Sequence, residues 1–198
     1  MRALRSLMLP VAAAALLSAC ANSTPTVGRG NVTYGDAKAV ETVTNQFGST
    51  DLQSIAEAMS RSLAQSVAGR PVKPLVTVAD IRNKTSEYID TRSITDTIRT
   101  QLLKSGTMRF ATDINDMKAQ TDELSRQNTT GLYKKSATAK VGNMQGAQYR
   151  IEGNISSIVK QNSDVKDVYY KFTLYMTDIE AGTVEWQDEK EIRKTSAR

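Results

Sequence analysis

Cys20 is the residue whose chemistry follows most directly from its sequence neighbours. It is the single cysteine among 198 residues, so it cannot form a disulfide within the chain or join a cluster of thiolate metal ligands. It closes the tetrad Leu17-Ser18-Ala19-Cys20, in which small residues precede the thiol. The position of this thiol therefore points to covalent modification rather than to redox or metal chemistry.

The residues before Cys20 have the composition of a secretory signal. Arg2 and Arg5 form a positive start, and an alanine-rich apolar run from Leu7 to Leu17 follows, too short to span a bilayer. The tetrad resembles the lipobox of bacterial lipoproteins, which implies removal of residues 1–19 and acylation of Cys20, palmitate included. More than one acyl chain suffices for stable membrane residence. The alternatives are an ordinary signal peptide that ends in cysteine, and a buried thiol.

Composition excludes several classes of function. The chain has no histidine, which removes histidine general bases, serine-histidine and cysteine-histidine dyads and histidine metal sites. It has no phosphate-binding glycine loop, and we expect no metal or cofactor. Four carboxylates lie on a polar, helix-like stretch, which favours a solvated helix face over a hydrolase pair: Asp113, Asp116, Asp122 and Glu123. We therefore expect a protein that is not an enzyme and has no small-molecule substrate.

The charge balance also argues against nucleic acid as a partner. The formal net charge is +5, and removal of Arg2 and Arg5 with the signal lowers it to +3. Such mild basicity is typical of a solvated surface of mixed sign.

The chain after Cys20 divides into a tether and a domain. Residues 20–48 are polar with few large apolar side chains, which is typical of a flexible segment. Residues 49–198 carry the periodic patterns of a globular domain. Thr50 and Gln53 have the spacing of a capping box, which predicts that a helix begins there.

Periodicity predicts the elements of this domain. Helices are expected from Thr50 to Val67, around Ile94–Leu103, over 114–127 and over 134–144. Strands are expected at 75–81, 108–112, 149–155, 168–176 and 184–187, and Trp186 is expected in the core rather than at a contact surface. Gly153 marks a bulge or a close backbone approach. The order predicts a single α/β domain with a mixed sheet, a C-terminal antiparallel meander and helices packed on the sheet.

Four segments together resemble the LpoB family. They are the lipobox with its tether, the strand and loop Val78–Thr85, the helix Thr95–Leu102 with Gly106 and Phe110 after it, and the final strands that begin at Gly146 and Gly182. Members of this family are outer-membrane lipoproteins that activate a bifunctional, class A penicillin-binding protein. The resemblance implies a fold similar to the N-terminal domain of TolB.

The resemblance also implies a function and a location. The chain would lie lipid-anchored at the periplasmic face of the outer membrane, bind a regulatory domain of the penicillin-binding protein, and stimulate peptidoglycan synthesis and so cell shape. The alternative is a structural or assembly lipoprotein of an outer-membrane or secretion complex. The tether is short, with Pro25 as its one proline, which leaves the partner open.

The loop after the first strand is the expected partner-binding site: Asn83, Lys84, Thr85, Glu87, Tyr88 and Ile89. Tyr88 and Ile89 are apolar side chains in a polar loop, and an exposed aromatic is a plausible anchor. The alternative is that both fold back into the core while Asn83 makes turn hydrogen bonds.

Overall fold

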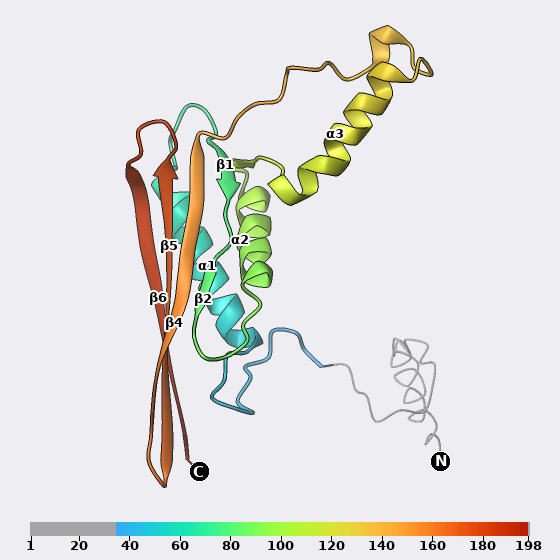
Figure 1. The fold of residues 1–198 in the computed structure, drawn as a ribbon. Coiled ribbons are helices and arrows are strands. Elements are labelled where there is room, and N and C mark those ends of the chain that lie inside the picture. The colour runs from blue at the N-terminus through green and yellow to red at the C-terminus, as the bar shows by residue number, and fades with distance from the viewer. Residues whose placement is uncertain (1–34, 198) are drawn as a thin grey trace, which may run out of the picture. The chain divides into compact units, whose positions relative to one another are not determined.

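The computed structural model describes residues 35–197 (Figure 1). The signal 1–19, Cys20 and the expected tether up to residue 34 lie outside the described residues. Residues from Asp36 onward form one compact unit.

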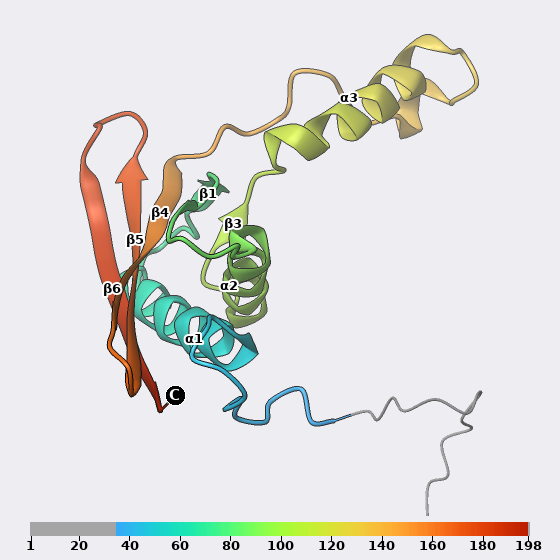
Figure 2. The ribbon, with the colours of Figure 1, turned by 60° about the horizontal axis from the view of Figure 1, so that its bottom comes forward.

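Two amphipathic helices form the helical layer of the domain. α1 spans Ser49–Ser66 and α2 spans Thr91–Ser105. Both cover the same face of the sheet, and no helix of residues 35–197 lies on the opposite face (Figure 2). The carboxylate of Asp90 starts α2 by accepting hydrogen bonds from the backbone of Arg92 and Ser93, and Gly106 ends it in a left-handed conformation at φ 66°.

Six strands of residues 35–197 form one mixed sheet in the order β3-β1-β4-β5-β6. β2 pairs with the same edge of β4 as β1 does, farther along β4. The strands are β1 Leu75–Val78, β2 Arg82–Lys84, β3 Arg109–Phe110, β4 Tyr149–Gln161, β5 Val165–Asp178 and β6 Val184–Ala197. β1 pairs in parallel with β3 and β4, and β2 also pairs in parallel with β4. β4, β5 and β6 form the antiparallel meander that the sequence predicted.

The core lies between the sheet and the two helices. Alternate β5 residues point into it, namely Val168, Tyr170, Phe172, Leu174 and Met176, and each is at most 1% exposed. Ile55, Met59 and Leu63 of α1 and Ile94, Ile98 and Leu102 of α2 meet them. The alternation of β5 was the strongest strand pattern in the sequence because one face of this strand is fully buried.

Two interior contacts on the meander agree with sequence expectations. A Cβ at Gly153 would lie 2.2 Å from the backbone oxygen of Thr173, so the expected close backbone approach is confirmed. Trp186 is partly buried against the core, and its indole nitrogen donates to the Ser62 hydroxyl at 3.3 Å.

Several local expectations were wrong. The predicted strand 75–81 ends already at Val78, and a second short strand, β2, which was not predicted, pairs with β4 from Arg82 onward. The predicted helix 134–144 is only a 3-10 turn, Lys135–Ala137. Glycine at 142, with φ 85°, and the absence of any buried residue in this segment leave a longer helix without support.

The start of α1 also differs from the prediction. Thr50 and Gln53 do not form a capping box. The Asp51 carboxylate accepts from the Gly48 amide at 2.9 Å, and the Glu41 carboxylate accepts from the Ser49 amide at 3.0 Å. A Cβ at Gly48 would lie 2.3 Å from that Glu41 oxygen, so glycine leaves room for this cap.

α3, Ile114–Thr129, forms as predicted but adds nothing to the core. No side chain described between residues 111 and 148 is buried. Hydrogen bonds join α3 to the chain that follows it. The Asn128 side-chain nitrogen donates to the Leu124 carbonyl within the helix at 2.8 Å and to the Ala139 carbonyl beyond it at 2.9 Å. This excursion between β3 and β4 is called the α3 lobe, residues 114–144, below.

Candidate functional site

The expected partner-binding loop joins β2 to α2. β2 is fixed on β4 through the pairs Arg82–Asn154, Asn83–Ile155 and Lys84–Ser156. Asp90 then caps α2, so both ends of the loop are attached to the domain. Asn83 and Lys84, which were expected in the loop, lie on β2, and the other four predicted residues lie between β2 and Asp90. The six residues have three different roles.

Asn83 and Thr85 build the turn itself. The Asn83 side-chain oxygen accepts from the Thr85 amide at 2.9 Å and from its hydroxyl at 2.8 Å. The Asn83 side-chain nitrogen donates to the Glu87 carbonyl at 2.8 Å. Asparagine and threonine side chains commonly replace backbone partners in this way. The turn role that the sequence left open for Asn83 is therefore the observed one.

Glu87 and Ile89 point inward. Ile89 is 6% exposed and belongs to the core cluster. One Glu87 carboxylate oxygen accepts from the Tyr170 hydroxyl at 2.5 Å, and the other accepts from the Phe47 amide at 3.0 Å. Burial and the hydrogen bond to Glu87 raise the pKa of Tyr170 well above its ordinary value, so this hydroxyl remains a donor. Glu87 is thus an internal support rather than a contact residue.

Asn83, Lys84 and Tyr88 are the exposed members of the predicted site, and only the Lys84 and Tyr88 side chains take no part in the hydrogen bonds of the turn. Tyr88 is 94% exposed, and Lys84 is also exposed. Within residues 35–197 neither side chain makes a hydrogen bond or an ion pair. Because tyrosine offers a large contact area at a low cost in conformational entropy, an unpartnered tyrosine on a braced turn is suited to docking.

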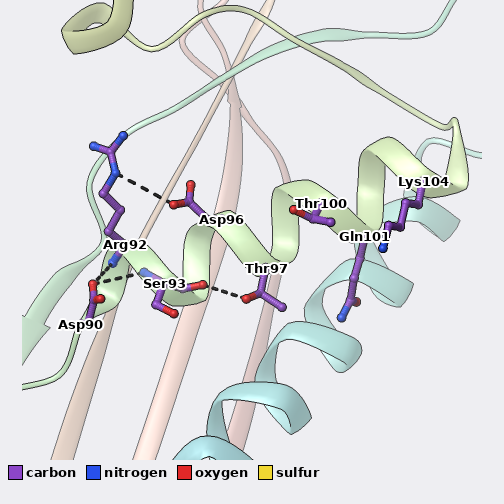
Figure 3. Close-up of a pocket in the computed structure, with 8 residues that line it drawn as sticks. All are labelled: Asp90, Arg92, Ser93, Asp96, Thr97, Thr100, Gln101 and Lys104. Carbon is purple, nitrogen blue, oxygen red and sulfur yellow. Dashed lines mark hydrogen bonds and ion pairs between the residues drawn. The ribbon is translucent and has the colours of Figure 1, made fainter. Parts of the chain in front are cut away.

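A polar hollow continues from the loop along α2 (Figure 3). Its lining is Asp90, Arg92, Ser93, Asp96, Thr97, Thr100, Gln101 and Lys104. Arg92 approaches Asp96 at 4.0 Å, and the Thr97 hydroxyl donates to the Ser93 carbonyl at 2.8 Å. The surface offers both charges and several hydroxyl and amide groups, which suits hydrogen bonding to a protein partner better than enclosure of a small ligand.

The part of the chain that the structure describes has no group of three or more carboxylates or thiols placed to hold a metal ion. No helix within residues 35–197 has the length and apolar character needed to cross a bilayer.

Sequence reasoning missed the residues that brace the loop from the other side. Asn45 was assigned to the flexible tether, yet it is 8% exposed and donates to the Lys166 carbonyl and the Ser196 hydroxyl at 3.3 and 3.0 Å. Phe47 packs edge-on against Tyr170, with ring centroids 5.8 Å apart. The available signal was Phe47, a large aromatic directly before the start of a helix, where an apolar residue often fixes the entry of the chain.

Comparison of the sequence with models of known protein families finds a match. Residues 51–192 match the family model described as the peptidoglycan-synthase activator LpoB. No curated protein matches in sequence. Solved structures of LpoB are among those similar to this chain. The C-terminal domain from Salmonella enterica is 15% identical, with 72% of this chain and 98% of that chain covered and a TM-score of 0.44. The protein from Escherichia coli is 14% identical, with 100% and 96% covered and a TM-score of 0.40.

The lipoprotein GNA1162 from Neisseria meningitidis is also similar, at 14% identity, with 62% of this chain and 84% of that chain covered and a TM-score of 0.39. All these similarities are low, and membership of the family rests on the match of the family model.

Proposed function

Because residues 51–192 match its model, this chain belongs to the family of the peptidoglycan-synthase activator LpoB, and we propose that it binds and activates a class A penicillin-binding protein. In this proposal it is a lipoprotein, attached through Cys20 to the periplasmic face of the outer membrane. It is a regulator of the synthase and not an enzyme itself.

The observation that supports docking most strongly is the exposed Tyr88 on a turn that the domain braces. Asn83 closes the turn, and Ile89 anchors its far end in the core. A surface held in place before binding loses less conformational entropy when the partner arrives. Tyr88 and Lys84 are therefore proposed as contact residues, with the polar side of α2 as the adjoining surface.

Activation by such a contact requires a difference in affinity. A regulator with no active-site chemistry accelerates an enzyme only if it binds the active conformation more tightly than the inactive one. A tenfold preference corresponds to about 1.4 kcal/mol.

The test is a glycan polymerisation assay with the host's purified class A penicillin-binding protein. The lipid-free chain, residues 21–198, is added over a range of concentrations. Acceleration that saturates near equal concentrations supports the proposal. Absence of both acceleration and binding contradicts it. Incubation with purified peptidoglycan, with no release of fragments expected, tests the claim that the chain is not a hydrolase.

The shortness of the tether favours a second candidate, an assembly lipoprotein of an outer-membrane or secretion complex. Roughly 15 residues separate Cys20 from Asp36 and reach at most about 50 Å when extended. A pull-down from solubilised envelopes distinguishes the two functions. Recovery of a class A penicillin-binding protein supports the synthase activator, and recovery of an outer-membrane complex without it supports the assembly role.

A further inference from the structure

The segment before α1 lies against the domain at several points and is called the strap, residues 36–48. The Ala37 carbonyl accepts from the Gln53 side chain at 2.7 Å, and the Glu41 amide donates to the Thr50 hydroxyl at 2.8 Å. Farther along, the Lys194 amine donates to the Gln46 carbonyl at 2.6 Å. The strap therefore contacts α1 and the C-terminal strand β6.

The last strap residues meet the partner-binding loop at Glu87. The Phe47 amide donates to one Glu87 carboxylate oxygen, and the Tyr170 hydroxyl donates to the other. The Tyr170 hydroxyl also lies 3.4 Å from the Asn45 carbonyl. The Glu87 carboxylate thus joins the loop to the strap, directly at the Phe47 amide and through Tyr170, a buried residue of β5.

The backbone of Glu87 belongs to the turn that carries the exposed residues. Its carbonyl accepts from the Asn83 side chain at 2.8 Å and lies 3.1 Å from the Thr85 hydroxyl. Its amide donates to the Thr85 hydroxyl at 3.2 Å. Tyr88 follows directly in the chain. Displacement of the Glu87 side chain would therefore loosen the turn and the position of Tyr88.

We propose that the docked strap positions the partner-binding loop through Glu87, so that loss of strap contacts weakens binding of the synthase. The inference rests on the proposed function. Glu87 is a positioning residue in this scheme, and Tyr88 and Lys84 are the contact residues.

The arrangement also relates binding to distance from the membrane. With the strap docked, the roughly 15 residues of 21–35 limit the reach to about 50 Å, whereas release of the strap gives roughly 28 residues and about 95 Å. Glu87 keeps its contact with the strap only when the strap is docked, which is the state with the shorter reach. A synthase farther away would be reached at the expense of an ordered loop.

The experiment uses the lipid-free chain, residues 21–198, and two variants that act from opposite sides. Phe47→Ala removes the ring that packs on Tyr170, and Glu87→Ala removes the shared carboxylate. Val43→Ala, at a strap residue 85% exposed, and Glu180→Ala, in the exposed turn before β6, are the matched controls.

Hydrogen exchange of the Thr85 and Glu87 amides measures the order of the turn without any partner. We expect exchange to be roughly five- to tenfold faster in Phe47→Ala and Glu87→Ala, as for the loss of about one hydrogen bond, with unchanged exchange at β5. Affinity for the host's purified class A penicillin-binding protein should fall by a similar factor, and both controls should match the parent chain. If a variant unfolds, Tyr170→Phe, which removes one hydroxyl contact with Glu87, takes its place.

Unchanged exchange at Thr85 and Glu87 in the folded variants would overturn the proposal. Faster exchange with unaltered affinity would also overturn it, because the loop would not limit binding. If the parent chain itself does not bind the synthase while the variants show faster exchange, the proposed function fails and the strap-to-loop contact stands.

Discussion

At the turn between β2 and α2, adjacent side chains have opposite roles. Tyr88 is 94% exposed and Ile89 is 6% exposed. From the sequence, Tyr88 and Ile89 were expected to have the same role, either both at the contact surface or both in the core. In the extended chain before α2, successive side chains point to opposite sides, so one faces solvent when the other is buried.

Substitution of the two neighbours should therefore separate binding from stability. Tyr88→Ala should weaken synthase binding by about 2 kcal/mol or more, as for an aromatic anchor, and shift Tm by less than about 2 °C. Ile89→Ala should lower the free energy of unfolding by about 2–4 kcal/mol because it empties a core position. Urea unfolding and titration with the synthase measure the two effects.

Two further variants calibrate this comparison. Lys84→Glu should weaken binding without a change in Tm, and Tyr133→Ala, in the α3 lobe, controls for removal of an aromatic. Unfolding of Tyr88→Ala, or binding equal to that of the parent chain, would contradict the assignment of Tyr88 to the contact surface.

Tyr170 gives a pH dependence that can be isolated. Burial first, and the hydrogen bond to Glu87 second, raise the pKa of this hydroxyl in the folded state above the ordinary 10.0. Below about pH 10 the tyrosine is neutral in both states, and its contribution to stability is complete. Above that pH the unfolded state ionises first, so stability falls by about 1.4 kcal/mol per pH unit from this group.

Tyr170→Phe provides the comparison. At pH 8 it should be less stable than the parent chain by about 1 kcal/mol, the value of a typical hydrogen bond. This difference should shrink as the pH rises from 10 toward 11, in urea unfolding at each pH. A difference that stays constant over that range would show that Tyr170 ionises no later in the folded state than in the unfolded state.

At the scale of elements, the α3 lobe is separate from the core. α3 has helix-forming periodicity, yet Ile114 is 81% exposed and no described residue of the helix is buried. The two ion pairs within the helix, Lys118–Asp122 and Arg126–Glu123, are also exposed, and such pairs contribute little to stability.

Replacement of residues 114–144 by a short Gly/Ser linker should leave the domain folded. We expect the free energy of unfolding to change by less than about 1 kcal/mol, because shortening a surface connection has a small entropic effect. Urea unfolding monitored at Trp186 measures it, and loss of cooperative unfolding would show that the lobe supports the core. The same variant in the polymerisation assay determines whether the lobe contributes to activation.

β6 and α1 are joined by an ion pair away from solvent. The Lys194 amine lies 2.9 Å from the Asp51 carboxylate, and the two side chains are 17% and 7% exposed. Asp51 also caps α1 through the Gly48 amide. Removal of the lysine would leave this carboxylate inside the domain without its counter-charge.

Lys194→Met should consequently destabilise the domain by about 3 kcal/mol, within the range for breaking one side of a buried pair. Lys160→Met, at the exposed end of β4, is the matched control and should change stability by less than about 0.5 kcal/mol. Equal unfolding midpoints for the two variants would show that the pair is not a net support of the fold.

At the scale of the whole molecule, the length of chain between the proposed lipid anchor and the domain limits how far from the membrane the domain can bind a partner. The structure begins the compact unit at Asp36 and not at residue 49, so the expected tether loses its last part to the domain. A lipid anchor at Cys20, which remains a prediction, would hold the domain within about 50 Å of the membrane when the strap is docked.

Deletion of residues 24–33 should separate reach from activity. About five residues would remain before the strap, with a reach of about 18 Å. We expect the lipid-free variant to stimulate the synthase as well as the parent chain does. The lipidated variant should fail to restore peptidoglycan synthesis in cells that lack the native gene. Full complementation by it would show that tether length does not limit function.

Local patterns in the sequence were sufficient for the elements that bury one face. The helical spacing in α1 and α2 and the unbroken alternation in β5 predicted these elements, because burial on one side imposes a period that short-range sequence displays. The strands β4, β5 and β6 are each longer than predicted. Near the β4–β5 turn Ile158, Val159 and Val165 are exposed, and where neither face of a strand is buried the alternation of apolar and polar residues is lost.

Which residues support the partner-binding loop from inside the domain depends on tertiary structure alone. Glu87 meets Phe47 across 40 residues of chain and Tyr170 across 83. Whether a glutamate in a polar loop faces solvent or a buried hydroxyl depends on which distant groups the fold brings beside it. The sequence by itself determined the family resemblance, the layers of the core and the loop that carries Tyr88. The division of that loop into contact residues and supports depends on long-range contacts that leave no periodic signal.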